Sequence, residues 1–377
     1  MIKKKFMDKF RIDTHKLHYH PDRVSALIDA KDDWNKHKEL KPIYAEISSS
    51  GSCNHRCTFC SVDYIGYKPI FLNRSLLKEF FDSARNIGLK SVMFAGDGEP
   101  LLNKEISDIV NDAASNGIDT SFTTNGVYLN SEFIRKAIHN VSWIKISMNA
   151  GNENSYEAIH RTRKEDFNKV WENIDNLVSH RRDNRNTNKC ALGIQSLLLP
   201  DNIDTLDELC ERAIDHGVDY VVLKPYVHNV YMKQEGYKNS LDYSSALYRD
   251  TVQSLSEKYK NVKDFNFVSR FNALEKLRGE VERYKTCWST PALWFYISGD
   301  GSVYGCGAHV GNENFKLGNV KEEKIENIWK SPERQKCLEY VQTKLDLNDC
   351  RRTCRMDEPN RYLYDIIEGN VLHKNFI

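Results

Sequence analysis

The 377-residue chain lacks the long apolar runs that would place it in a membrane or on a secretion route. It has no stretch of about 18 apolar residues, so no membrane span is expected. The N-terminal Met-Ile-Lys-Lys-Lys leads into further charged residues, Asp8, Lys9 and Arg11, and not into an apolar segment. This pattern argues against a signal peptide, and we expect a cytoplasmic protein.

The chain also lacks an excess of charge of either sign. Its 54 Lys and Arg residues balance 53 Asp and Glu residues, which gives a net charge of +1. Such a balance provides no bulk attraction to nucleic acid or to anionic lipids, so we expect neither as a partner. A content of 40% hydrophobic and 28% charged residues is typical of a globular domain.

Cysteine is abundant, with ten residues distributed unevenly. In a cytoplasmic chain, clustered cysteines more often bind a metal or carry out chemistry than form disulfides. Three lie within residues 53–60, and Cys190 and Cys210 stand alone, as expected of small buried apolar side chains. The other five follow position 286: Cys287, Cys306, Cys337, Cys350 and Cys354.

Between residues 43 and 225, short apolar runs bounded by Gly, Asn, Pro or Ser alternate with stretches of helical periodicity. The predicted strands are Ile43–Ser50, Ser91–Ala95, Thr120–Thr124, Trp143–Met148, Leu192–Leu199 and Tyr220–Lys224. The predicted helices are Ser75–Ile87, Phe167–Val178 and Asn202–His216. Six such repeats imply an α/β fold with a parallel sheet, either a partial barrel or a doubly wound open sheet. In both, the chemistry belongs at the carboxyl ends of the strands.

Outside this region the pattern changes. Residues 1–42 form a polar N-terminal extension, and residues 230–285 predict helix plus a strand at Phe265–Phe271. Residues 286–377 carry the second set of cysteines. There, Phe295–Ile297 and Ser302–Tyr304 flank a Ser-Gly-Asp-Gly turn and predict a hairpin, and a helix is predicted at Ile325–Val341. The predicted divisions are therefore 1–42, 43–285 and 286–377.

The first cysteine set, Cys53-x₃-Cys57-x₂-Cys60, follows the first predicted strand directly. Three thiolates on one loop can bind three irons of a [4Fe–4S] cluster and leave the fourth iron open to a ligand. His55 lies within the same loop, so a zinc site is a second interpretation of these residues.

These residues resemble the signature of the radical S-adenosylmethionine (SAM) superfamily, C-x₃-C-x-aromatic-C, with Phe59 as the aromatic residue. The resemblance implies a partial (β/α)6 TIM-like barrel with a small C-terminal α+β auxiliary-cluster domain. It also implies that SAM chelates the open iron and that an electron from the cluster cleaves it to a 5′-deoxyadenosyl radical. An external donor such as flavodoxin or ferredoxin would supply that electron.

Further positions resemble SAM-binding elements of this family. Gly96-Asp97-Gly98-Glu99-Pro100, after the second predicted strand, is similar to its GGEP motif, with Asp97 in place of the second glycine. The other positions at which the resemblance implies cofactor contacts are Asn125, Ser147, Asn149 and Arg161. A guanidinium such as that of Arg161 suits the SAM carboxylate, although a solvated basic pair is an equally simple interpretation.

Two residues at the end of the sixth predicted strand, Lys224 and Tyr226, are the candidates for catalytic contact with substrate. Lys224 lines the substrate cavity only if it points inward, and a shift of one residue in register would reverse its face.

The second cysteine set resembles the SPASM and twitch modules, which carry auxiliary clusters in radical SAM enzymes. Cys287 and Cys306 flank the predicted hairpin, with Gly301 five residues before Cys306, and Cys350-x₃-Cys354 follows. These four cysteines fit one auxiliary [4Fe–4S] cluster better than the two of a full SPASM module. Cys337 lies in a predicted helix and is left out of the ligand set, although it could replace one member. A structural zinc site is the alternative.

The family resemblance does not define the substrate, because one fold supports many reactions. Residues 1–42 are too few for a cobalamin-binding or leader-peptide-binding domain. We expect hydrogen abstraction from a small polar molecule, such as a sugar, cyclitol or nucleotide-linked sugar. The auxiliary cluster would take part in an oxidation or a redox-assisted rearrangement. The alternatives are a SPASM-type peptide maturase that cross-links or epimerises a peptide, and a non-catalytic zinc-binding protein.

Overall fold

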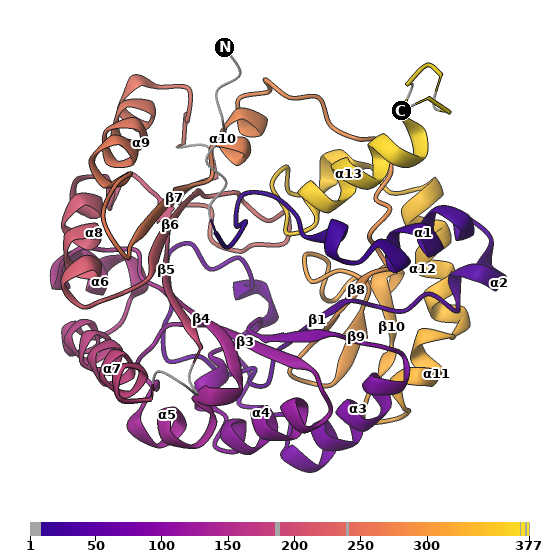
Figure 1. Ribbon diagram of the computed structural model, residues 1–377, viewed down its shortest axis with the longest axis horizontal. Helices are drawn as coiled ribbons and strands as arrows, with labels where there is room; N and C mark the ends of the chain where they lie inside the picture. Colours follow the sequence, from indigo (N-terminus) through magenta and orange to yellow (C-terminus); the bar gives the residue numbers. More distant parts are fainter. Residues whose placement is uncertain (1–8, 185–188, 239–240, 370, 374, 377) are drawn as a thin grey trace.

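The computed structural model describes residues 9–369 except 185–188 and 239–240, together with residues 371–373 and 375–376. Ten strands form one sheet in the order β10-β9-β8-β1-β2-β3-β4-β5-β6-β7 (Figure 1). The strands are β1 (Tyr44–Ile47), β2 (Ser91–Phe94), β3 (Asp119–Thr124), β4 (Val141–Ser147), β5 (Ala191–Leu198), β6 (Tyr220–Pro225), β7 (Asn266–Ser269), β8 (Trp294–Ile297), β9 (Ser302–Tyr304) and β10 (Lys316–Asn319).

Helices cover the outer side of this curved sheet (Figure 1). They are α1 (Pro21–Ala30), α2 (Trp34–His37), α3 (Arg74–Asn86), α4 (Ile106–Ser115), α5 (Ser131–Ala137), α6 (Glu153–His160), α7 (Lys164–Asp183), α8 (Leu206–Asp215), α9 (Ala246–Tyr259), α10 (Phe271–Leu277), α11 (Ile325–Trp329), α12 (Pro332–Thr343) and α13 (Asp357–Glu368). Helix α3 shows how the sequence specifies them, because Asn73 caps its first turn and Phe80, Phe81 and Ala84 place one apolar stripe in the core.

The six predicted strands and the partial barrel are confirmed, and the parallel sheet extends beyond them at both ends. Strand β7 pairs in parallel with β6, and β8 pairs in parallel with β1. Among the strands of the described residues, β9 runs opposite to the others and pairs antiparallel with both β8 and β10. The predicted hairpin is therefore present, as β8 and β9, but it continues the barrel sheet.

Each parallel strand presents one face to the helices and the other to the barrel interior. Ala45 and Ile47 of β1 and the Ile144 and Ile146 side chains of β4 belong to the main apolar core beneath the helices. The residue between each pair points the opposite way, because side chains alternate along a strand. Charged side chains such as Lys145 thus face the interior.

An apolar floor covers the interior near the start of β6. Phe10 and Ile12 of the N-terminal extension pack there against the side chains of Tyr220, Val222 and Val268. The rings of Phe10 and Tyr220 have centroids 4.9 Å apart. The opposite end of the barrel, where the strands end, is where the first cysteine loop lies.

Several predicted elements have different limits from those expected, and two of them differ in kind. The predicted helix Ile325–Val341 is divided into α11 and α12, because Pro332 begins a new helix whose first turn is capped by the Ser331 hydroxyl, 3.2 Å from the Arg334 amide nitrogen. The predicted strand Phe265–Phe271 shortens to β7, and α10 begins at Phe271. Within the described residues, no helix is long and apolar enough to cross a membrane.

Candidate functional site

The first cysteine set lies on the loop after β1, at the carboxyl end of the barrel. Burial raises the pKa of Cys57, and the adjacent thiols of Cys60 and Cys53 raise it further. Burial also raises the pKa of Cys53 to about 12. Three thiols that repel one another when ionised are a donor set suited to a cationic centre, because metal binding removes that repulsion. The residues therefore fit a [4Fe–4S] cluster with three protein ligands.

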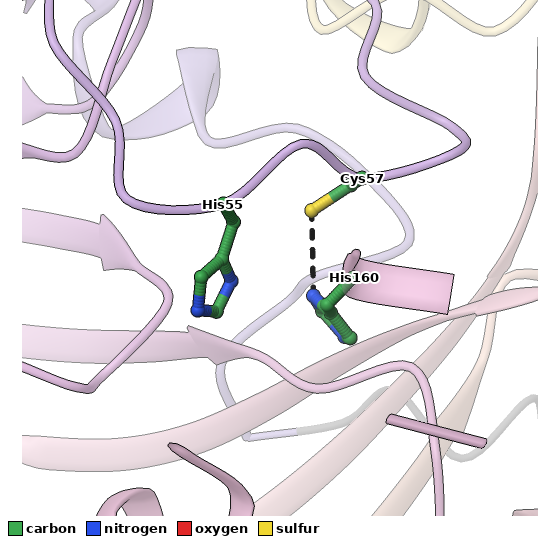
Figure 2. Close-up of side chains that lie close together, drawn as sticks. All are labelled: His55, Cys57 and His160. Atoms are coloured by element: carbon green, nitrogen blue, oxygen red, sulfur yellow. Dashed lines mark hydrogen bonds between the residues drawn. The ribbon is translucent and has the colours of Figure 1, made fainter. Parts of the chain in front are cut away.

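His160, at the end of α6, contacts one of these sulfurs (Figure 2). Its Nδ1 lies 3.4 Å from Cys57 Sγ, and its Nε2 lies 3.1 Å from the amide nitrogen of Asn149. An amide N–H only donates, so Nε2 accepts and the ring proton lies on Nδ1. Burial lowers the pKa of His160 well below its usual value, which keeps the ring neutral. Nδ1–H therefore donates to the sulfur of Cys57.

The same hydrogen bonds argue against zinc at this position. The ligand atoms of His55, Cys57 and His160 all lie within 4.8 Å of one another. Metal binding through Nδ1 of His160 would move the ring proton to Nε2, where it would face the N–H of Asn149. His55 in turn points its Nε2 to within 3.5 Å of the Asp166 carboxylate. The geometry thus disfavours the zinc interpretation of this loop.

The cysteine loop is held between α6 and the segment that follows β6. The Thr58 amide donates to the Ile159 carbonyl at 2.9 Å. The Asp63 carboxylate accepts the amides of Lys233 and Gln234, each at 2.9 Å, and the Gln234 side chain donates to the Cys57 carbonyl at 3.0 Å. His160, Asp63 and Gln234 were not predicted from the sequence, because no local pattern marks contacts between segments so distant in the sequence.

Glu99 of the Gly-Asp-Gly-Glu-Pro turn connects β2 to β3. Its carboxylate accepts the Thr124 hydroxyl at 2.6 Å and the Asn125 amide at 2.7 Å. The side chain of Asn125 then donates to Asn54 in the cysteine loop at 2.7 Å. Gly98 allows the two loops to approach, since a Cβ there would lie 2.2 Å from the Ser52 carbonyl oxygen. These residues therefore fix the position of the cysteine loop.

Asp97, which stands where the family motif has glycine, points toward the C-terminal hairpin. Its buried carboxylate accepts the Tyr296 hydroxyl at 2.5 Å, the Ser298 hydroxyl at 2.6 Å and the Gly299 amide at 2.9 Å. Burial raises the pKa of Asp97 while these donors lower it. The Asp97 amide also donates to the Ser48 hydroxyl at 3.0 Å, so both its side chain and its backbone N–H are held by protein contacts.

The remaining cofactor candidates surround the loop in different ways. Phe59 packs edge-on against the His160 ring, with centroids 5.6 Å apart. The Asn149 side-chain oxygen accepts the Leu197 amide at 2.7 Å, which ties it to β5. Arg161 is exposed, and its guanidinium donates to the Gln234 side chain at 2.9 Å.

Ser147 ends β4 on the same face as Lys145, two residues earlier, and is half-buried. Its position faces the barrel interior near the carboxyl end of the strand. The assignment of Ser147, and of the other cofactor contacts, to SAM stays a prediction.

The two candidates for substrate contact differ in their surroundings. Lys224 is half-buried on the interior face of β6. Tyr226 is buried in an apolar cluster that Phe59 contacts. Its hydroxyl lies 3.1 Å from both His228 Nδ1 and Met232 Sδ. The side chain of Lys224 is therefore available to a ligand, whereas the Tyr226 hydroxyl already has protein partners.

The second cysteine set comes from three segments: the one before β8, the one after β9 and the one before α13. Burial raises the pKa of Cys306, and the thiols of Cys354, Cys287 and Cys350 raise it further. Two N–H groups surround this set: Asn360 Nδ2 donates to Cys287 Sγ at 3.2 Å, and His309 Nε2 lies 3.4 Å from Cys350 Sγ. The four predicted ligands therefore lie together, and their chemistry fits a fully protein-ligated [4Fe–4S] cluster.

Cys337 lies behind this set in α12 and is buried. The thiol of Cys287 acts on it, whereas the thiols that act on Cys306 are those of Cys354, Cys287 and Cys350. Its exclusion from the ligand set stays a prediction.

The sequence matches two family models. The radical SAM superfamily model matches residues 47–213, and the SPASM iron–sulfur cluster-binding domain matches residues 287–355. The chain is 24% identical over 308 residues to a tungsten-containing aldehyde ferredoxin oxidoreductase cofactor-modifying protein of Pyrococcus furiosus, covering 78% of this chain and 81% of that protein.

Two further comparisons cover different extents. A GTP 3′,8-cyclase of Clostridium botulinum is 32% identical over 36% of this chain and 43% of its own length, so the match spans less than half of the cyclase. The structure of Streptococcus suis SuiB bound to its precursor peptide SuiA superposes with a TM-score of 0.65. It is 17% identical and covers 89% of this chain and 74% of that one, which shows the fold alone.

Proposed function

Because this chain belongs to the radical SAM superfamily and carries a SPASM domain, we propose that it abstracts a hydrogen atom from a small polar substrate. A sugar, a cyclitol or a nucleotide-linked sugar is the class we favour. Its cofactors are a [4Fe–4S] cluster, SAM and auxiliary iron–sulfur ligation. When bound, the first cluster and SAM supply the 5′-deoxyadenosyl radical that takes the hydrogen atom.

The observation that carries the choice of a polar substrate is the charge on the barrel interior. Glu46, Lys145 and Lys224 face inward from β1, β4 and β6. Charged groups on a partly desolvated surface are costly unless they meet a charged or hydrogen-bonding partner. Glu46 already pairs with Arg355 at 3.2 Å, so a polar substrate would provide partners for the two lysines, which an apolar one would bury without compensation.

The relatives support the same choice. The Pyrococcus furiosus protein, similar over most of both chains, is described as modifying the cofactor of an oxidoreductase, and a cofactor is a small molecule. The cyclase similarity, which extends over 143 residues, involves an enzyme named for GTP. Both names point to low-molecular-weight polar substrates.

The auxiliary site defines the redox part of the proposal. Cys287, Cys306, Cys350 and Cys354 provide four protein ligands, which leave no iron open to substrate. A cluster of this kind can accept or return an electron, so we favour an oxidation or a redox-assisted rearrangement. An external donor of the flavodoxin or ferredoxin type would reduce the first cluster.

The proposal is tested by measuring 5′-deoxyadenosine formed by the anaerobically reconstituted enzyme with SAM and a reductant. Cell extract is separated into a low-molecular-weight fraction and a peptide fraction. We expect the small-molecule fraction to increase 5′-deoxyadenosine above the substrate-free background, and the Cys53/Cys57/Cys60→Ala variant to form none. Stimulation by the peptide fraction alone would support the alternative, a SPASM-type peptide maturase that cross-links or epimerises a peptide.

A further inference from the structure

Lys145 and Lys224 face the same side of the sheet, on either side of β5. Lys145 pairs in register with Gly193, and Lys224 pairs with Leu197. Residues in register on neighbouring strands point to one face, and positions 193 and 197 share a face because they are four residues apart. Both lysines therefore face the barrel interior, between the apolar floor and the cysteine loop.

Neither ammonium group has an acidic partner within the described part of the chain. Lys145 Nζ lies over the Trp143 ring, 5.2 Å from its centroid, and neither lysine takes part in a protein hydrogen bond or ion pair among the described residues. Both side chains are half-buried, so a ligand in the interior can reach them. In register Lys224 lies four residues nearer the carboxyl ends of the strands than Lys145, and the charge of Lys145 acts on Lys224 across the interior.

The nearby carboxylates are already paired. Glu46 lies 3.2 Å from the Arg355 guanidinium, and Asp13 lies 3.3 Å from Arg270. These arginines act on both lysines as additional positive charge. The interior therefore carries two lysine amines that no carboxylate of the described residues pairs with.

The pKa shifts of the two lysines agree with the absence of an acidic partner among the described residues. Burial, together with the charges of Arg355 and Arg270, lowers the pKa of Lys145 to about 7 against the opposing effect of Glu46. Burial also lowers the pKa of Lys224, and Lys145 is the first of the charges that add to this effect. An anion between them would reverse both effects, since an opposite charge favours the protonated amine.

A glycine on β5 leaves space beside Lys145 for an aromatic ring. Gly193, beside Lys145, leaves room for the Tyr220 ring, because a Cβ at Gly193 would lie 2.1 Å from that ring. Tyr220 belongs to the apolar floor and is in register with Gly193 and, through it, with Lys145, whereas Lys224 lies four residues further along β6. A group bound between the lysines therefore has an apolar wall on the side of Lys145.

We propose that Lys145 and Lys224 form a subsite for a phosphoryl group of the substrate. The inference rests on the proposed function and adds the substrate's charge to it. A phosphoryl group carries about −1.5 to −2 at pH 7 and matches two lysines, whereas a single carboxylate would leave one positive charge uncompensated. The substrate is thus a phosphorylated small molecule, such as a sugar phosphate or a nucleotide.

The test is calorimetric titration of inorganic phosphate into the anaerobically reconstituted full chain, with acetate as the carboxylate comparison. The variants are Lys145→Met and Lys224→Met, which keep side-chain volume and remove the charge. Lys145→Arg retains a positive charge and controls for misfolding. Lys136→Met, at an exposed lysine of α5 that pairs with Glu132, is the matched control for loss of a lysine elsewhere.

We expect each interior methionine variant to weaken phosphate binding about tenfold or more, and Lys145→Arg and Lys136→Met to stay within about threefold of wild type. Acetate should bind more weakly than phosphate. The subsite is wrong if wild type binds phosphate with a Kd above about 10 mM, if both interior methionine variants bind it as wild type does, or if acetate binds equally well.

The outcome is separable from that of the proposed function. A wild-type enzyme that binds phosphate through these lysines but forms no 5′-deoxyadenosine with any small-molecule fraction would retain the subsite and refute the proposed function. An enzyme that forms 5′-deoxyadenosine with that fraction, while the lysine variants bind phosphate normally, would refute the subsite alone.

Discussion

The hydrogen bond from His160 to Cys57 places an N–H donor on one thiolate of the first cluster. Such donors stabilise the more negative, reduced state of an iron–sulfur cluster and raise its reduction potential. We therefore expect His160→Phe to lower the potential of the first cluster by roughly 30–60 mV, about a threefold to tenfold change in the one-electron equilibrium. Potentiometric titration followed by electron paramagnetic resonance measures this shift directly.

The control for that experiment is His216→Phe. His216 follows α8 and pairs with Asp175, so its loss removes a histidine without touching a cysteine. A His160→Phe enzyme with full iron content and an unchanged potential would show that this hydrogen bond has no redox role.

A second residue-scale prediction concerns pH. Lys145 has a pKa lowered to about 7, and the charged groups acting on it are Arg355, Arg270, Lys224 and Glu46. A bound phosphoryl group favours the protonated amine, so affinity falls as pH rises above 7 and the free enzyme loses that proton. Between pH 6.5 and 8.5 we expect the phosphate affinity of wild type, relative to Lys145→Arg, to fall about tenfold or more.

The arginine variant makes this measurement interpretable, since arginine stays protonated throughout the range. The ratio of the two dissociation constants removes the ionisation of phosphate itself and of Lys224. A ratio that does not change with pH would mean that Lys145 does not titrate against the bound anion.

At the residue scale, the sequence predicted the cysteines well and their surroundings poorly. The spacing of Cys53, Cys57 and Cys60 is local and therefore readable. The contact between Cys57 and His160 joins residues 103 positions apart and has no local signal. Lys145 was missed for a related reason, because only the register of β4 against β5 shows that it faces the same side of the sheet as Lys224.

At the scale of elements, Asp97 joins the turn after β2 to the hairpin of β8 and β9. Asp97→Ala would leave the buried hydroxyls of Tyr296 and Ser298 without their acceptor, at a cost of about 2–4 kcal/mol. For a chain of this length we expect a fall in Tm of about 3–5 °C, measured by circular dichroism on the reconstituted protein.

The matched control is Asp300→Ala, in the exposed turn of the same hairpin, where the carboxylate accepts the Ser302 amide at 2.9 Å. That variant should change Tm by about 1 °C or less, since surface substitutions have small effects. If the two variants lower Tm equally, the buried Asp97 contacts do not stabilise the attachment of the hairpin.

The elements themselves were largely predictable. The alternation of apolar runs and helical periodicity identified all six strands from β1 to β6, because each is buried and bounded by turn residues. The boundary between α11 and α12 was missed, although Ser331-Pro332 carries the cap and the N1 proline that begin a helix. The pairing of β8 with β1 joins segments about 250 residues apart, and no local pattern encodes it.

At the scale of the whole molecule, the pairing of β8 with β1 connects the two cysteine-bearing regions through one continuous sheet. The first set follows β1, and the second begins before its neighbour β8 and continues after β9. Contacts of Asp97 with Tyr296 and Ser298 further connect the two regions. The sequence divided the chain at residue 286 because the composition changes there, but the backbone hydrogen bonds continue across that division.

The two cysteine sets together predict the iron content of the chain. Wild type should contain about eight irons after anaerobic reconstitution, and Cys306→Ala about four, because a four-cysteine cluster loses one ligand. Cys337→Ala should retain about eight, because Cys287, Cys306, Cys350 and Cys354 already provide four thiolates for one cluster. Iron and sulfide analysis of the two variants under identical conditions decides the ligand set, and loss of about four irons from Cys337→Ala would make Cys337 a ligand.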